Sequence, residues 1–154
     1  MSRSLSGSCP GLVRDVTRRT RHSLIVDDNA VIRNGFCEVF NREPDFEGCG
    51  EAENGREAIR KAQSLRPDLI ILDFAMPVMN GMDAARGLKK LLPTVPLLMY
   101  SAFGDKYVQQ QAGFIGIAAL ISKSEPASCL VDKARTLLRD RIAQLLSAEL
   151  EKNS

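Results

Sequence analysis

Residues 68–73 read Asp-Leu-Ile-Ile-Leu-Asp, a short apolar run closed by a carboxylate. The four apolar residues do not alternate with polar ones, which is typical of a central strand of a parallel sheet that is buried on both faces. We therefore predict that Asp73 lies at the carboxyl end of a buried strand in an α/β fold.

On both sides of this strand, from Ser23 onward, short apolar runs alternate with segments of helical periodicity. This pattern is typical of a parallel sheet covered by helices on both faces. Asn29 is a predicted helix N-cap, and Asn54 with Glu57 three residues later resembles a capping box. Five strand–helix pairs predict a doubly wound five-stranded parallel sheet of order 2-1-3-4-5. The predicted strands are Ser23–Val26, Glu47–Ala52, Asp68–Leu72, Val95–Tyr100 and Ala118–Ile121.

The composition is that of a globular domain. The chain has 154 residues, of which 44% are hydrophobic and 26% charged, and its formal net charge is +2. This length suits one domain, and the charge balance does not indicate a nucleic acid as partner. No apolar run approaches the roughly 20 residues of a membrane span, and the N-terminus lacks the apolar core of a signal peptide. We therefore expect a cytoplasmic protein that binds no membrane.

The four cysteines, Cys9, Cys37, Cys49 and Cys129, form no CxxC pair and accompany no histidine cluster. This scatter encodes neither a zinc site nor a disulfide framework. We therefore expect reduced, mostly buried thiols.

Residues 1–21 predict a basic arm without a fixed fold, because Ser, Gly and Pro are frequent and five arginines accompany a single aspartate. A solvated tail is the favoured interpretation. The alternative is an arm that contacts an acidic partner or nucleic acid.

Three carboxylates fall at predicted strand ends: Asp27 and Asp28 follow the first strand, and Asp73 follows the third. In the order 2-1-3-4-5 these strands are neighbours, and their carboxyl ends flank the switch point where ligands bind. Three adjacent carboxylates repel one another unless a cation intervenes. Mg²⁺ prefers oxygen ligands and is typically held by one or two carboxylates plus a phosphate. The cluster therefore predicts a Mg²⁺ site suited to phosphoryl chemistry.

Ser101 and Lys123 end the fourth and fifth predicted strands at the same edge. A hydroxyl donates to a phosphoryl oxygen, and an ammonium pairs with the same negative group. Any one of these side chains alone would be interpreted as a helix cap or a strand end. Together with the carboxylates they predict the formation and hydrolysis of an acyl phosphate on Asp73.

Four segments occur in order: Leu24-Ile25-Val26-Asp27-Asp28, the Asp-x-x-Met-Pro-x-Met-x-Gly run of residues 73–81, Ser101-Ala102, and Ile121-Ser122-Lys123. Residues 22–140, which contain them, resemble the receiver domain of two-component response regulators.

The resemblance implies a flavodoxin-like fold in which Asp73 takes phosphate from a histidine kinase or a histidine phosphotransfer protein. It also implies that the backbone carbonyl of Ala75 completes a Mg²⁺ site with Asp27, Asp28 and Asp73. The donor histidine belongs to the partner, so His22 has no expected role. A receiver is expected not to be an enzyme, apart from its own Mg²⁺-dependent self-phosphorylation and self-dephosphorylation.

Three departures from the family pattern qualify these expectations. Leu120 stands where many receivers have an aromatic residue, so the usual aromatic switch is not expected. Lys123 precedes Ser124 instead of the frequent proline, which resembles receivers of the subfamily that usually carries a helix-turn-helix effector. Ala75 and Phe103 flank the site and neither orients a water, so slow self-dephosphorylation is predicted.

The last helix is predicted to extend beyond the receiver, because its apolar stripe continues into residues 141–154. Residues 139–154 are too few for a helix-turn-helix domain. A stand-alone receiver acting through protein contacts or phosphorelay is therefore favoured over a transcriptional regulator whose DNA-binding domain lies outside this chain. Exposed apolar residues between Ile142 and Leu150 indicate a homodimer through the last helix, or docking onto an unidentified downstream protein.

Overall fold

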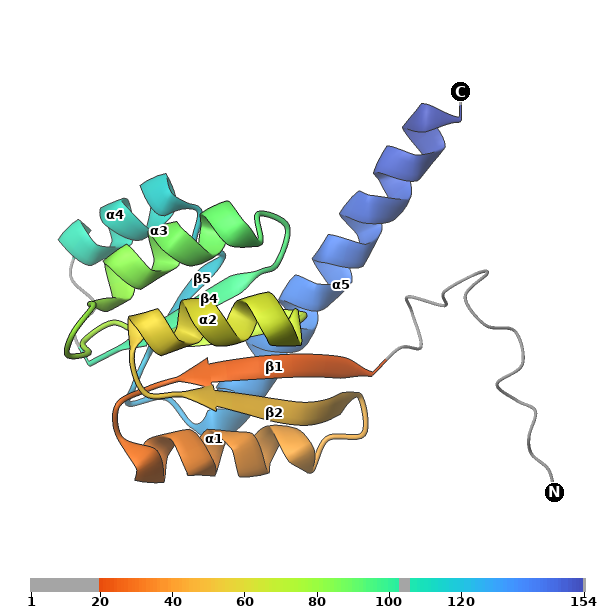
Figure 1. The fold of residues 1–154 in the computed structure, drawn as a ribbon. Helices are drawn as coiled ribbons and strands as arrows, with labels where there is room; N and C mark the ends of the chain where they lie inside the picture. The colour runs from red at the N-terminus through yellow and green to blue at the C-terminus, as the bar shows by residue number, and fades with distance from the viewer. Residues whose placement is uncertain (1–19, 103–105, 154) are drawn as a thin grey trace, which may run out of the picture.

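The computed structural model describes residues 20–102 and 106–153 of the chain. Strands and helices alternate along the chain, and the helices cover both faces of one sheet (Figure 1). Neighbouring strands are parallel and follow the order β2-β1-β3-β4-β5, which confirms the predicted topology. The strands are β1 (Arg21–Val26), β2 (Phe46–Ala52), β3 (Leu69–Asp73), β4 (Leu97–Ser101) and β5 (Ala119–Ser122), and the helices are α1 (Ala30–Asn41), α2 (Gly55–Leu65), α3 (Gly81–Leu91), α4 (Lys106–Ile115) and α5 (Ala127–Lys152).

The central strand β3 is buried along its whole length. From Leu69 to Asp73, each residue exposes at most 1% of its surface. Leu69 and Ile71 pack into the core that α1 and α5 cover, and Ile70 and Leu72 pack into the core beneath α2 and α3. The absence of alternation in this run therefore has the predicted cause, since both faces of the strand are covered by helices.

Asparagine caps begin the helices that follow β1, β2 and β3. The side chain of Asn29 accepts from the first backbone N–H groups of α1, and Asn80 caps α3 in the same way. Asn54 accepts from Glu57 N at 2.9 Å, while the Glu57 carboxylate accepts from the N–H of Glu53. The reciprocal bond of the predicted capping box thus reaches the residue before the cap.

The first strand begins two residues before the predicted Ser23, at Arg21. Residues 1–19 of the predicted basic arm lie outside the described residues.

The expectation of reduced thiols is wrong for two of the four cysteines. Cys37 of α1 and Cys49 of β2 form a disulfide, with 5.6 Å between their Cα atoms. Helix α1 packs against the sheet beside β2, so the fold brings together two residues whose spacing in the sequence carries no such signal. Cys129 is a free, exposed thiol and not a buried one, and Cys9 lies outside the described residues.

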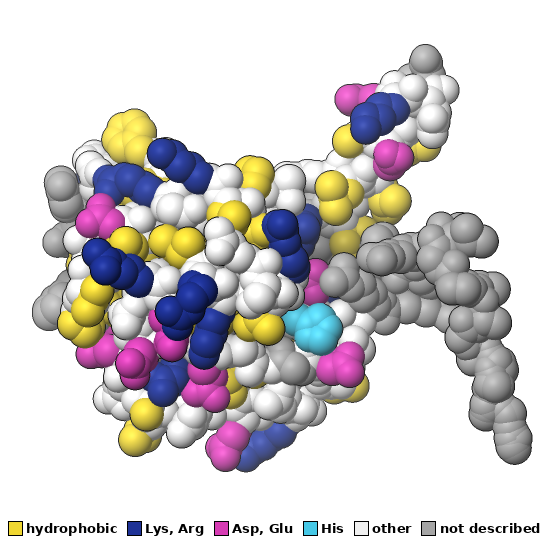
Figure 2. All heavy atoms as spheres, in the orientation of Figure 1, with side chains coloured by type: hydrophobic (Ala, Val, Ile, Leu, Met, Phe, Trp, Pro, Cys, Tyr) yellow, Lys and Arg dark blue, Asp and Glu magenta, His cyan; other side chains and the backbone are white. Residues whose placement is uncertain are grey.

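Helix α5 confirms the predicted extension. Its first half packs on the sheet through buried residues, whereas its second half projects away from the body of the domain (Figure 1). Hydrophobic side chains gather along the projecting part (Figure 2), where Leu145, Leu146 and Leu150 are 43%, 49% and 71% exposed. Across residues 20–102 and 106–153, no helix has the length and apolar character needed to cross a membrane.

Candidate functional site

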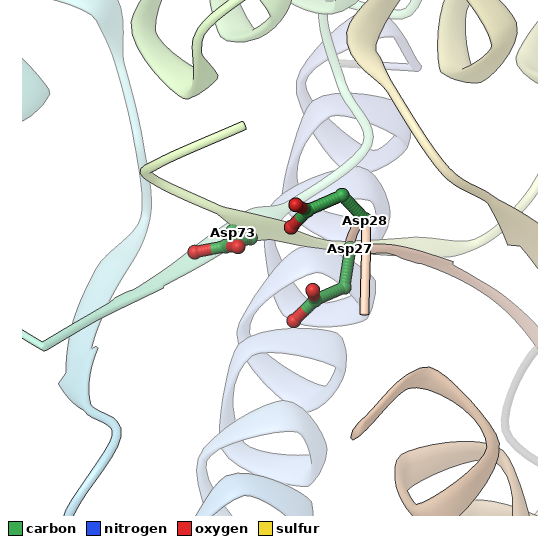
Figure 3. A group of neighbouring side chains, drawn as sticks. All are labelled: Asp27, Asp28 and Asp73. Atoms are coloured by element: carbon green, nitrogen blue, oxygen red, sulfur yellow. The ribbon is translucent and has the colours of Figure 1, made fainter. Parts of the chain in front are cut away.

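The predicted carboxylates lie together at the carboxyl edge of the sheet. Val26 of β1 pairs with Leu72 of β3, so the residues that follow these two strands become neighbours. Figure 3 shows Asp27 and Asp28 at the end of β1 beside Asp73 at the end of β3, and ligand oxygens of the three lie within 4.8 Å of one another. Asp27 and Asp73 are each 1% exposed, while Asp28 faces solvent. A cluster of hard oxygen donors of this kind could hold a divalent cation.

Asp73 carries an unfavourable charge in this setting. Burial raises the pKa of its carboxyl, and the opposing hydrogen bond from Lys123 and the repulsive charge of Asp27 act more weakly. The ammonium Nζ of Lys123 lies 3.0 Å from Asp73 Oδ1. Lys123 offsets one of three adjacent negative charges, so a further cation would relieve the remaining repulsion.

Ser101 and Lys123 come from the two strands beyond β3. Ser101 is the last residue of β4 and is 3% exposed. The backbone N–H of Lys123 donates to the carbonyl of Ser101 at 2.9 Å, which holds the start of the loop after β5 against β4. The fold therefore brings both side chains to the edge that carries Asp73.

Ala75 lies in the loop after β3. Its backbone N–H donates to Asp73 Oδ1 at 3.2 Å. Ala75 and Asp28 both line a pocket of about 620 Å³ on the side of α3. The loop thus runs directly beside the carboxylate cluster.

Gly81 begins α3 where that helix approaches the end of β3. A Cβ at this position would lie 2.5 Å from the carbonyl oxygen of Asp73 and 2.7 Å from the Cα of Phe74. The N–H of Gly81 also donates to the Phe74 carbonyl at 2.8 Å. Close packing against backbone therefore explains this glycine.

The loop between Asp73 and Gly81 contains a strained turn. Val78 has φ = 71°, which is unusual for a β-branched residue. The N–H of Met79 donates to the carbonyl of Pro77 at 2.7 Å, so Val78 is the central residue of a three-residue turn. Such strain is often found beside functional sites.

Tyr100 is a site neighbour that the sequence reasoning missed. Its hydroxyl donates to Asp27 Oδ2, and its ring meets Phe36 edge-on at 5.1 Å between centroids. Burial, followed by the hydrogen bond to Asp27, raises the pKa of the Tyr100 hydroxyl, so the phenol stays neutral. A buried tyrosine usually finds a partner for its hydroxyl. A tyrosine directly before Ser101 in a central strand was therefore a usable signal.

Leu120 is partly buried against the core beneath α2 and α3. The aromatic ring beside the site comes instead from Tyr100 of β4. His22 is exposed near the start of β1, at the end of that strand remote from Asp27. Phe103, one of the two residues on which the predicted slow dephosphorylation depends, lies outside the described residues.

An apolar cleft of about 390 Å³ lies between α1 and α5, next to Lys123. Phe36 and Tyr100 contribute aromatic surface to it, and Glu125 adds a carboxylate. The cleft therefore places an apolar surface beside Lys123, at the edge of the sheet that carries Asp73.

A family model described as the response regulator receiver domain matches residues 23–135. The protein-glutamate methylesterase/protein-glutamine glutaminase of Pyrococcus abyssi is 36% identical over 133 residues, which cover 86% of this chain and 36% of that protein. The response regulator protein VraR of Staphylococcus aureus is 35% identical over 116 residues, which cover 75% of this chain and 56% of VraR. The chain thus spans about a third to just over half of the length of these relatives.

Solved structures have the same fold. The response regulator domain of Thermotoga maritima CheB matches with a TM-score of 0.73 and 29% identity, over 79% of this chain and 98% of that one. A two-component response regulator of the LuxR family from Aurantimonas sp. matches with a TM-score of 0.74 and 24% identity, over 84% of this chain and 97% of that one.

The prediction that the chain is not an enzyme is contradicted by these relatives. The Pyrococcus protein is named as a methylesterase and glutaminase, and a protein of the same name in Aliivibrio fischeri is 38% identical over 125 residues. The similarity covers the receiver region, which makes up about a third of the length of each of these relatives.

Proposed function

The chain belongs to the family of response regulator receiver domains, and from this premise we propose that it is a phosphorylation-dependent switch whose phosphoacceptor is Asp73. The observation that carries the proposal is the position of Asp73. Its buried carboxylate lies beside Asp27 and Asp28, and the ammonium of Lys123 is 3.0 Å away. A carboxylate nucleophile, oxygen ligands for a cation and a positive charge therefore meet at one point.

The carboxylate set fits Mg²⁺. Asp27, Asp28 and Asp73 supply hard oxygen donors within 4.8 Å of one another, and the buried charge of Asp73 is under-neutralised. The carbonyl of Ala75 would add a neutral ligand from the adjacent loop. When bound there, Mg²⁺ supplies charge neutralisation for the incoming phosphoryl oxygens.

In the proposed transfer, a carboxylate oxygen of Asp73 attacks the phosphorus of a phosphohistidine on a histidine kinase or phosphotransfer protein. The P–N bond breaks, its electron pair stays on the imidazole nitrogen, and that nitrogen takes a proton. Lys123 pairs with one phosphoryl oxygen and the hydroxyl of Ser101 donates to another. Hydrolysis reverses the state: water attacks the acyl phosphate, and inorganic phosphate and the Asp73 carboxylate result.

The direct test uses acetyl phosphate and Mg²⁺ with the whole chain. The native protein is expected to gain the mass of one phosphoryl group, and Asp73→Asn is expected to gain none. Omitting Mg²⁺ is expected to abolish the gain in the native protein. A native protein that gains no mass, and whose spectrum does not respond to beryllofluoride and Mg²⁺, would refute the proposal.

We propose that the output of the switch runs through protein contacts. For its input, we propose that the cleft between α1 and α5 admits an apolar side chain of the phosphoryl donor. The cleft lies beside Lys123, so a partner seated there is close to Asp73. Ile32 lines this cleft, whereas Val31 is 80% exposed on the same helix. Ile32→Asp is expected to slow transfer from a histidine phosphotransfer protein while leaving transfer from acetyl phosphate intact. Val31→Asp is the neighbouring control, and equal slowing by both variants would count against the cleft.

A second candidate output is enzyme-linked. It is favoured by the identity of 36% to a protein-glutamate methylesterase over 86% of this chain. In this form, the phosphorylated receiver would control the hydrolysis of glutamate methyl esters by a methylesterase domain. The test adds the beryllofluoride-bound chain to a methylesterase and measures methanol release from methylated protein. An unchanged rate of release would exclude this output for the enzyme tested.

A further inference from the structure

Tyr100 reaches from β4 to β1 beneath the end of β3. In the sheet it pairs with Asp73, and its hydroxyl donates to the carboxylate of Asp27, which is 73 residues away in the sequence. Tyr100 and Asp27 are each 1% exposed. The contact is therefore a buried connection between the two strands that carry the proposed metal ligands and the strand that carries Ser101.

The contact fixes the orientation of Asp27. One carboxylate oxygen, Oδ1, accepts from the N–H of Asn29 at 2.7 Å, and the other, Oδ2, accepts from the Tyr100 hydroxyl. A carboxylate offers about four lone-pair sites, so the two donors leave acceptor capacity on each oxygen. Two donors from different segments hold the side chain so that the remaining lone pairs have a set direction.

The ring of Tyr100 also faces the phosphoryl side of the site. Lys123 Nζ lies 5.4 Å from the ring centroid while it is 3.0 Å from Asp73 Oδ1. The ring of Phe36 packs edge-on against the ring of Tyr100. A lysine ammonium over an aromatic face is attracted to it, and the attraction is stronger where water is excluded. One side chain therefore contacts both the metal side and the phosphoryl side of the cluster.

We propose that Tyr100 is a positioning residue for phosphoryl transfer to Asp73: its hydroxyl orients Asp27 toward Mg²⁺, and its ring orients Lys123 toward the phosphoryl group. This inference rests on the proposed function. A tyrosine that served the core alone would be replaced by phenylalanine without effect on metal affinity. By contrast, removal of a group that orients a metal ligand typically lowers metal affinity or activity by about 10–100-fold.

The experiment compares the native chain with Tyr100→Phe and Tyr100→Leu. Calorimetry without a phosphodonor measures the Mg²⁺ dissociation constant, and acetyl phosphate measures the rate of labelling as Mg²⁺ is varied. Tyr100→Phe is expected to weaken Mg²⁺ binding about tenfold or more, with a labelling rate at saturating Mg²⁺ close to the native one. Tyr100→Leu is expected to lower that saturating rate as well, because Lys123 loses the aromatic face.

A Mg²⁺ affinity of Tyr100→Phe within about twofold of the native value would overturn the inference, because the lost hydroxyl would then carry none of the effect expected of a positioning group. If the native protein labels and binds Mg²⁺ in that result, the proposed function stands and this inference alone fails. A native protein that neither binds Mg²⁺ nor labels overturns both.

A second measurement keeps Tyr100 in place, so it tests the inference even if Tyr100→Phe or Tyr100→Leu fails to fold. The chain has two tyrosines and no tryptophan, so Tyr107→Phe leaves Tyr100 as the single phenol emitter. A phenol that donates to a carboxylate is quenched. Mg²⁺ at Asp27 is therefore expected to raise the emission of Tyr100, and an emission that does not respond to Mg²⁺ would overturn the inference.

Discussion

Replacing Asp73 with asparagine is expected to stabilise the fold in the absence of metal. The carboxylate repels Asp27 by about 3 kcal/mol at an effective dielectric constant of about 20, since ligand oxygens of the cluster lie within 4.8 Å. Removing the charge of Asp73 from water costs about a few kcal/mol more, which is the effective desolvation penalty after the surrounding protein relaxes.

Lys123 opposes these two effects. Its ammonium, 3.0 Å from Asp73 Oδ1, contributes about 5 kcal/mol by the same relation before screening. The side chain of Lys123 is 30% exposed, and solvent reduces this attraction. Burial is the largest influence on Asp73 and raises its pKa. Repulsion and desolvation together therefore outweigh the attraction of Lys123. We expect Asp73→Asn to raise the free energy of unfolding by about 1 kcal/mol.

The raised pKa of Asp73 also determines how native stability changes with pH. The ordinary pKa of 3.8 applies to Asp73 in the unfolded chain, and the folded value is higher. The folded state therefore binds more protons, and native stability falls as pH rises through the window above 3.8. The advantage of Asp73→Asn should be absent below that window and complete at neutral pH.

Urea unfolding in EDTA and in saturating MgCl₂ provides the assay. With a slope of about 1.5 kcal/mol per molar urea, the midpoint of Asp73→Asn should rise by roughly 0.7 M in EDTA. Mg²⁺ should stabilise the native protein and leave the variant almost unchanged.

Asp68→Asn is the matched control at the other end of the same strand. Asp68 is 5% exposed, lies 4.0 Å from Arg141 Nη1, and accepts from the N–H of His22. This carboxylate faces a cation, so its replacement should destabilise the fold by about 1 kcal/mol. If Asp73→Asn loses stability in EDTA as Asp68→Asn does, the attraction of Lys123 dominates and the reasoning is refuted.

Three further predictions follow from other parts of the molecule. In thermal melts, Gly81→Ala should lower the free energy of unfolding by about 1–3 kcal/mol, because its Cβ would meet backbone at 2.5 Å. Gly113→Ala is the control, and it should be neutral or stabilising because a Cβ there would have nothing within 4 Å. Arg135→Ala should destabilise the protein by about 1 kcal/mol at neutral pH. Arg135 holds the pKa of Asp45 below 3.8, so this loss should shrink as pH falls through the lowered value, and a loss independent of pH in urea titrations would contradict the assignment. Leu146, 49% exposed on the projecting part of α5, should mediate self-association, so Leu146→Asp should shift a dimer to a monomer in size-exclusion chromatography, and identical elution of both proteins would exclude the contact.

The fold was predictable because its strongest signals are local. Residues 69–72 are apolar without alternation, and the helix caps at Asn29 and Asn54 lie within three residues of the N–H groups that they accept from. The extension of α5 followed from the spacing of its apolar residues, which continues past the point where the sheet ends. Each of these signals needs only a short window of sequence.

What the sequence did not reveal depends on distant contacts. The hydroxyl of Tyr100 finds its partner 73 residues away, across a strand that lies between them. The Cys37–Cys49 disulfide likewise depends on how α1 packs beside β2. The carboxylate cluster could be predicted although Asp27 and Asp73 are far apart, because the strand order alone brings their strand ends together.

The same repulsion accounts for the instability of the site and for its proposed use. A cluster of Asp27, Asp28 and Asp73 that the ammonium of Lys123 only partly neutralises raises the free energy of the folded chain. A divalent cation that binds there would relieve the repulsion, so the free energy that the repulsion costs becomes part of the driving force for binding. A variant that relieves the repulsion by removing Asp73 must therefore lose metal affinity as it gains stability. The two effects should be opposite in sign in one titration, and this opposition separates a functional cluster from carboxylates that merely end strands.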